Sequence, residues 1–70
     1  MRLQAVKDAC EAAPFRPFNL HMADGREVEV PAPDFVSIQP QGRTVLVWTR
    51  EGGFRVLDMA LITGIAFTHG

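Results

Sequence analysis

The residues of this chain most able to do chemistry are two histidines, His21 and His69, and one cysteine, Cys10. A catalytic histidine needs a nucleophile or an acid beside it in a cleft, and a metal site needs several such ligands together. The sequence offers no partner at a suitable spacing, and no glycine-rich segment carries the lysine of a phosphate-binding loop. We therefore predict that the protein is not an enzyme and has no catalytic residue, cofactor or metal. A small hydrolase or metal site at His21 ranks third among the hypotheses.

His21 and Cys10 also fit simple structural roles. Alternation along the chain predicts that His21 faces outward from a strand opposite Glu27 or Glu29, as one member of a cross-strand charged pair. Cys10 lies on the apolar stripe of an expected helix. A lone thiol in that position acts as a small buried hydrophobe rather than as a reactive group.

Arginine is the residue type that points to a binding function. Four arginines fall on expected turns or outward strand positions: Arg26, Arg43, Arg50 and Arg55. Arginine beside an exposed aromatic such as Trp48 can bind an RNA backbone and stack a base. The net charge is −1, however, whereas a nucleic-acid binder usually carries a basic excess. RNA binding through these four residues is therefore the second hypothesis.

The segment Arg43–Arg50 is the strongest predicted strand, because nearly all of its residues favour β structure. It is apolar on both faces, and a small domain has little with which to cover the second face. Either Leu46 and Trp48 or Val45 and Val47 are then available to contact another surface. The leading hypothesis is a binding or assembly module that acts through a homo-oligomer surface, with Leu46 and Trp48 as contacts.

A β-hairpin at residues 17–31 starts the sheet that must position these groups. Phe18, Leu20 and Met22 alternate with polar residues, and Val28 and Val30 do the same on the return arm. A period of two is typical of a strand with one buried face. Asp24-Gly25 between the arms is a strong hairpin signal, since glycine accepts the positive φ of a tight turn.

The remaining elements follow from apolar runs and their breakers. A helix is expected over about residues 1–12, ended by the proline at position 14. Further strands are expected over 35–38, 43–50, 54–57 (with Arg55 outward) and 62–67, and a single helical turn over Met59–Leu61 capped by Asp58. The prediction is a single mainly β domain over residues 1–70. Its N-terminal helix precedes a five- or six-stranded antiparallel, strongly bent small barrel.

Composition agrees with a folded domain. The chain has 70 residues, of which 47% are hydrophobic and 21% charged. No apolar run is long enough for a membrane span, and charges interrupt the N-terminal segment where a signal peptide would be apolar. A single cysteine fits a reducing compartment. We therefore expect a cytoplasmic protein without a membrane partner.

The stretch Phe18–Arg26, with alternating residues leading into a glycine-containing turn, resembles the start of the first Sm motif. Together with the helix and the short bent strands, it makes the chain similar to Sm-like proteins within the SH3-like small barrels. The resemblance implies that fold and a habit of forming rings or other oligomers. The family's glycine on the next strand is replaced by Val28–Val30, and residues 31–35 stand where its RNA-reading loop would be. RNA-binding residues are therefore not carried over.

A second resemblance concerns layout alone. Four short stretches look like those of a group of short bacterial proteins of unassigned function: Pro14–Phe18, the turn Asp24–Arg26, and the late segments Val56–Asp58 and Ile62-Thr63. This similarity implies a bacterial stand-alone domain and no particular activity.

Overall fold

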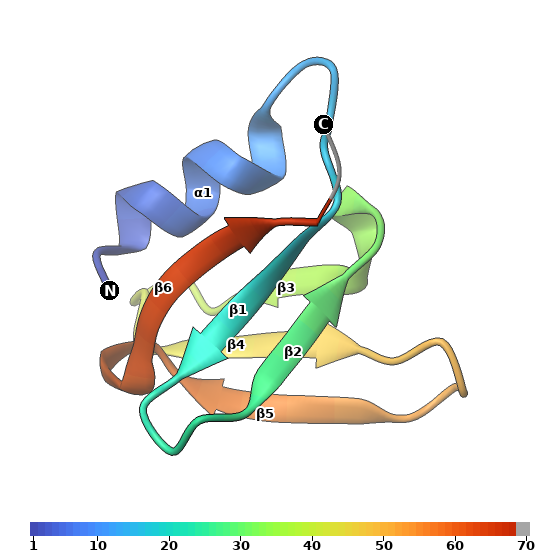
Figure 1. Cartoon of the computed structure of the whole chain (residues 1–70). Helices are drawn as coiled ribbons and strands as arrows, with labels where there is room; N and C mark the ends of the chain where they lie inside the picture. Colours follow the sequence, from blue (N-terminus) through green and yellow to red (C-terminus); the bar gives the residue numbers. More distant parts are fainter. Residues whose placement is uncertain (69–70) are drawn as a thin grey trace.

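The computed structural model describes residues 1–68, so His69 and Gly70 lie outside the described residues. The fold is mainly β, with one α-helix and six strands in two three-stranded antiparallel sheets (Figure 1). In chain order the elements are α1 (Leu3–Glu11), β1 (Phe18–Met22), β2 (Glu27–Val30), η1 (Pro33–Phe35), β3 (Val36–Ile38), β4 (Thr44–Trp48), β5 (Phe54–Asp58), η2 (Met59–Leu61) and β6 (Ile62–Phe67). The 3-10 turn η2 is capped by the Asp58 side chain, as predicted, through a 2.9 Å bond from the Ala60 N–H.

Strand β1 is the centre of the first sheet, whose order is β2-β1-β6. On one side β1 pairs with β2 through the predicted hairpin, in which Gly25 has a φ of 92°. The Asp24 carboxylate accepts the Arg26 N–H at 3.0 Å and so closes the turn. On its other side β1 pairs antiparallel with β6, and Phe18 lies opposite Phe67. The inward residues of β1 are all buried, as the alternation predicts.

Helix α1 adds a third element to the core. Val6 is fully buried and Ala9 nearly so, while Leu3 and Cys10 pack against the core from its margin. Burial raises the pKa of the Cys10 thiol above its ordinary value, and the neighbouring Glu11 carboxylate adds to the effect. The predicted apolar stripe is confirmed, although Cys10 is half-buried rather than fully enclosed. Among residues 1–68, no helix is long and apolar enough to cross a lipid bilayer.

The second sheet, of order β3-β4-β5, contributes one face to the same core. Val45 and Val47 of β4 are fully buried, and Leu57 of β5, which pairs with Val45, is 4% exposed. These three side chains determine which residues of the β4–β5 hairpin face the core and which face outward, since successive residues of a strand point to opposite faces.

Leu57 therefore forces its neighbours on β5 outward. Phe54 and Val56 lie on the face away from the core and are exposed. The predicted exposure of Arg55 is confirmed, but the face that it occupies differs from the prediction. Arg55 pairs with Val47 and shares the core side of the sheet with Leu57, beyond the end of the core.

Because Val45 faces the core and Val56 faces outward, we expect alanine substitutions at these two positions to lower the free energy of unfolding by different amounts. Val45→Ala should lower the free energy of unfolding by about 2 kcal/mol, because it removes two methyl groups from a closed core. Val56→Ala, at an exposed position, should change it by less than about 0.5 kcal/mol. Urea denaturation of both variants measures the difference, and similar losses in the two would contradict the assignment of faces.

Candidate functional site

The outer face of the β4–β5 hairpin carries four apolar side chains that the core does not use. Leu46 and Trp48 of β4 lie opposite Val56 and Phe54 of β5, respectively. Trp48 is 42% exposed, Phe54 56% and Val56 62%, while Leu46 is half-buried. We call these four residues the outer patch. It settles which side of the strand is free: Leu46 and Trp48 face outward, whereas Val45 and Val47 are in the core.

The turn between the two strands sets the register that assembles this patch. Gly52 has a φ of 96°, which favours glycine. The Thr49 N–H donates to the Gly53 carbonyl at 2.8 Å, and the Thr49 hydroxyl oxygen accepts the Gly53 N–H at 3.0 Å. These bonds place Trp48 directly opposite Phe54, with ring centroids 5.2 Å apart. Such aromatic pairs add favourable contact beyond burial alone.

Polar residues border the outer patch on the same face of the sheet. Ser37 of β3 lies opposite Leu46, and Thr44 of β4 lies opposite Asp58 of β5. An apolar centre with aromatic residues and a polar rim is the composition of protein–protein contact surfaces.

The four candidate arginines do not form one surface. Arg43 precedes β4 and Arg50 follows it, so the length of the strand separates them. Arg26 lies in the β1–β2 turn, where its Nε donates to the Asp24 carboxylate at 2.7 Å. Arg55 projects from the core side of β5, as described above. Within residues 1–68 the structure gives ion pairs to Arg26 and Arg50 but not to Arg43 or Arg55.

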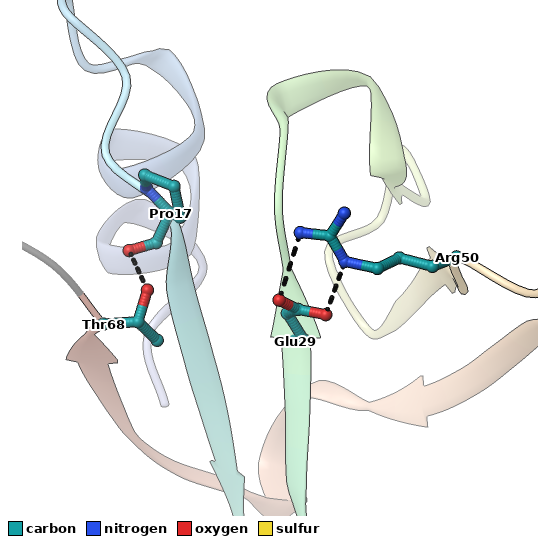
Figure 2. Close-up of polar contacts among 4 residues, drawn as sticks. All are labelled: Pro17, Glu29, Arg50 and Thr68. Carbon is teal, nitrogen blue, oxygen red and sulfur yellow. Dashed lines mark hydrogen bonds and ion pairs between the residues drawn. The ribbon is translucent and has the colours of Figure 1, made fainter.

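The Arg50 side chain forms an ion pair that links the two sheets. Its guanidinium reaches from the β4–β5 turn to Glu29 on β2 and donates to both carboxylate oxygens, at 3.0 and 3.3 Å (Figure 2). The hydrogen bonds from Arg50 hold the pKa of the Glu29 carboxyl below its ordinary value, and the Arg50 charge acts in the same direction. The pKa of Arg50 is raised by the same partner.

A shallow depression lies beside this ion pair, and we call it the charged depression. Its lining comprises Glu27, Val28, Glu29, Pro31, Trp48, Thr49, Arg50, Glu51 and Arg55. Three carboxylates and two guanidinium groups give it a net charge of −1 (−3 plus +2). This lining brings Arg50 and Arg55 together near Trp48, along with acidic residues that the sequence analysis did not place beside them.

His21 has the cross-strand partner that the sequence predicts. It lies opposite Glu27, with Nε2 3.6 Å from a carboxylate oxygen. The same oxygen accepts the Asn19 side-chain N–H at 3.0 Å. No group of three or more His, Cys, Asp or Glu side chains in the described part of the chain is placed to hold a metal ion.

Within residues 1–68, two other large hydrophobic side chains are exposed outside the outer patch, those of Leu61 and Phe67. Phe67 is in edge contact with Phe18, and the Arg16 guanidinium covers it 4.5 Å from the ring centre. The Thr68 hydroxyl, next along the chain, donates to the Pro17 carbonyl at 3.3 Å and ties the end of β6 to the start of β1 (Figure 2).

Leu61 of η2 is the other exposed side chain, and it lies beside the β1–β2 turn. The Ala23 N–H of that turn donates to the Leu61 carbonyl. The outer patch is therefore the largest grouping among these exposed side chains.

Phe54 and Val56 are the members of the patch that sequence reasoning did not assign to it. The sequence signal was Leu57. If Leu57 points into the core, the even-numbered residues of the same strand, Phe54 and Val56, must point outward.

Comparison of the chain with protein-family models, with curated proteins and with solved structures finds no match. The candidate surface therefore depends on the geometry of this chain.

The Glu29–Arg50 pair predicts a pH dependence. Because the folded-state pKa of Glu29 is lowered, the pair stabilises the fold above the unfolded-state pKa, near 4.5, and this contribution is lost as pH falls through the lower folded-state value. Arg50→Gln should return the pKa of Glu29 toward 4.5. Carboxyl-carbon NMR titration measures this change, and an unaltered Glu29 pKa in the variant would contradict the contact.

Arg26→Gln is the matched control. The largest cause of the lowered Asp24 pKa is the backbone N–H of residue 26, which this substitution keeps. The pKa of Asp24 should therefore remain below its ordinary value, and that of Glu29 should not change.

Proposed function

We propose that the protein is a non-enzymatic assembly module, built as a small Sm-like or SH3-like barrel, that self-associates through the outer patch. The observation that carries this proposal is the pairing of Leu46 with Val56 and of Trp48 with Phe54 on a face that the core leaves exposed. A cytoplasmic setting is part of the proposal, since one half-buried thiol suits a reducing compartment.

The path of the chain between the two sheets supports a barrel-like arrangement. β2 pairs with β1 in one sheet, and β3, which follows after the short turn η1, pairs with β4 in the other. The chain thus crosses from one sheet to the other within the short proline-containing segment 31–35. Both sheets then face a single core, as a strongly bent small barrel requires.

Strand edges add support for self-association. In the order β3-β4-β5 the outer strands are β3 and β5, and β5 itself carries Phe54 and Val56. An exposed strand edge beside an apolar face is a surface that tends to pair with another chain. Tryptophan and phenylalanine are also enriched in such contacts relative to the rest of a protein surface.

RNA binding is the second candidate, because Trp48, Arg50 and Arg55 line one depression. A ring protein that used these side chains together with Arg26 and Arg43 would combine stacking with phosphate contacts. The net charge of the charged depression is negative, however, and Arg50 already binds Glu29. Phosphate would have to compete with a carboxylate at this point, and self-association is therefore preferred.

Self-association predicts that the apparent mass rises with protein concentration. Light scattering coupled to size exclusion, from about 10 µM to 1 mM, should show an oligomer that Phe54→Ser dissociates, because the substitution removes a central aromatic contact. Leu61→Ser is the matched control: Leu61 is 51% exposed, close to the 56% of Phe54, but lies outside the patch. A monomer at the highest concentration would overturn the proposal.

Short single-stranded RNA should not bind, even at low salt, where phosphate contacts are strongest. Fluorescence anisotropy with a labelled oligonucleotide tests this expectation. Salt-dependent binding that is lost in the double variant Arg50→Ala and Arg55→Ala would instead establish the second candidate. The double variant Arg2→Ala and Lys7→Ala, in and beside α1, removes the same charge elsewhere and controls for net charge.

A further inference from the structure

The outer edge of β5 offers backbone groups for pairing. At the two ends of the β4–β5 ladder the Thr49 N–H donates to the Gly53 carbonyl and the Met59 N–H donates to the Arg43 carbonyl. The register between these bonds is unbroken, and antiparallel pairs alternate between bonded and non-bonded positions. Residues 53, 55, 57 and 59 therefore bond toward β4. Phe54 and Val56 direct their backbone N–H and C=O groups to the open side.

The outer patch is too small to form a stable interface by itself, so the neighbouring edge of β5 has to contribute to the contact. With the exposed fractions given above, Trp48, Phe54 and Val56 present together roughly 300 Å². A stable interface of standard size buries about 800 Å² on each partner. The patch alone supplies less than half of this area, so a partner must also cover its surroundings. The β5 edge adjoins the patch and is the nearest backbone able to extend the contact.

We propose that two copies of the chain pair β5 with β5 in antiparallel fashion about a two-fold axis at Val56, which forms one sheet of order β3-β4-β5-β5-β4-β3. This inference rests on the proposed self-association and specifies its geometry. A second copy is the occupant because a two-fold contact needs the same surface on both partners, and β5 supplies backbone edge and apolar side chains together. The two outer patches then lie side by side on one face of the joined sheet.

Charge selects this register among the two-fold alternatives. An axis at Arg55 would set Arg55 directly against Arg55 of the second copy, and like charges in that position are destabilising. An axis at Leu57 would set Val56 against Asp58 and separate the two patches. With the axis at Val56, the two valines face each other and Arg55 lies opposite Leu57. No like charges of β5 are then opposed, and the free backbone groups of Phe54 and Val56 meet the partner strand.

Single-cysteine variants test the register directly, in a background with Cys10→Ala. The Val56→Cys pair would have Cα atoms about 5.5 Å apart, within the range that a disulfide spans. The Phe54→Cys residues of the two copies would lie about 13 Å apart along the strands, beyond that range. Under mild oxidation, Val56→Cys should form covalent dimers at least ten times faster than Phe54→Cys. Equal rates, or a faster rate for Phe54→Cys, would overturn the inference.

Lysine substitutions on the two edges provide the second measurement. Val56→Lys should weaken the dimer at least tenfold in sedimentation, whereas Ser37→Lys, on the same face of the sheet but at the β3 edge, should not. Both positions are exposed, so circular dichroism should show a folded protein in each case. A monomer without substitutions would overturn both the proposed function and this inference. A larger ring, or a dimer that Val56→Lys leaves intact, would overturn only the inference.

Discussion

Val45, Val47 and Leu57 enter the core from one side of the β3-β4-β5 sheet and belong to the same core cluster as Phe18 and Leu20 of β1. The remaining arrangement of the hairpin follows from this burial. A strand has two faces only, so fixing these three side chains inward fixes every neighbour outward. The exposed position of Trp48, Phe54 and Val56 is thus a consequence of the core and does not need a separate cause.

Two ion pairs join parts of the fold through charged side chains. Glu29 and Arg50 join the edge of one sheet to the turn of the other, and Asp24 holds Arg26 within a single turn. Two of the four candidate RNA-binding arginines thus have carboxylate partners.

Much of the fold could be predicted from local pattern. The first hairpin, the helix stopped before Pro14 and the turn capped by Asp58 each depend on residues close together in sequence. The outer patch was predicted only for its β4 half, because Phe54, Val56 and Leu57 are all apolar and alternation alone does not choose between the two faces. The Glu29–Arg50 contact joins positions 21 apart and required the three-dimensional arrangement of the sheets.

The pairing of β1 with β6 has a consequence for how the chain acquires its structure. Phe18 pairs with Phe67 and His21 with Gly64, separations of 49 and 43 positions, whereas the strands of the second sheet are neighbours along the chain. Contacts this distant carry a large loop-closure cost and slow the folding of small β domains. During synthesis β1 is complete long before β6 emerges. One side of β1 therefore stays open until β6 is available, and in that interval pairing with other chains competes with native folding.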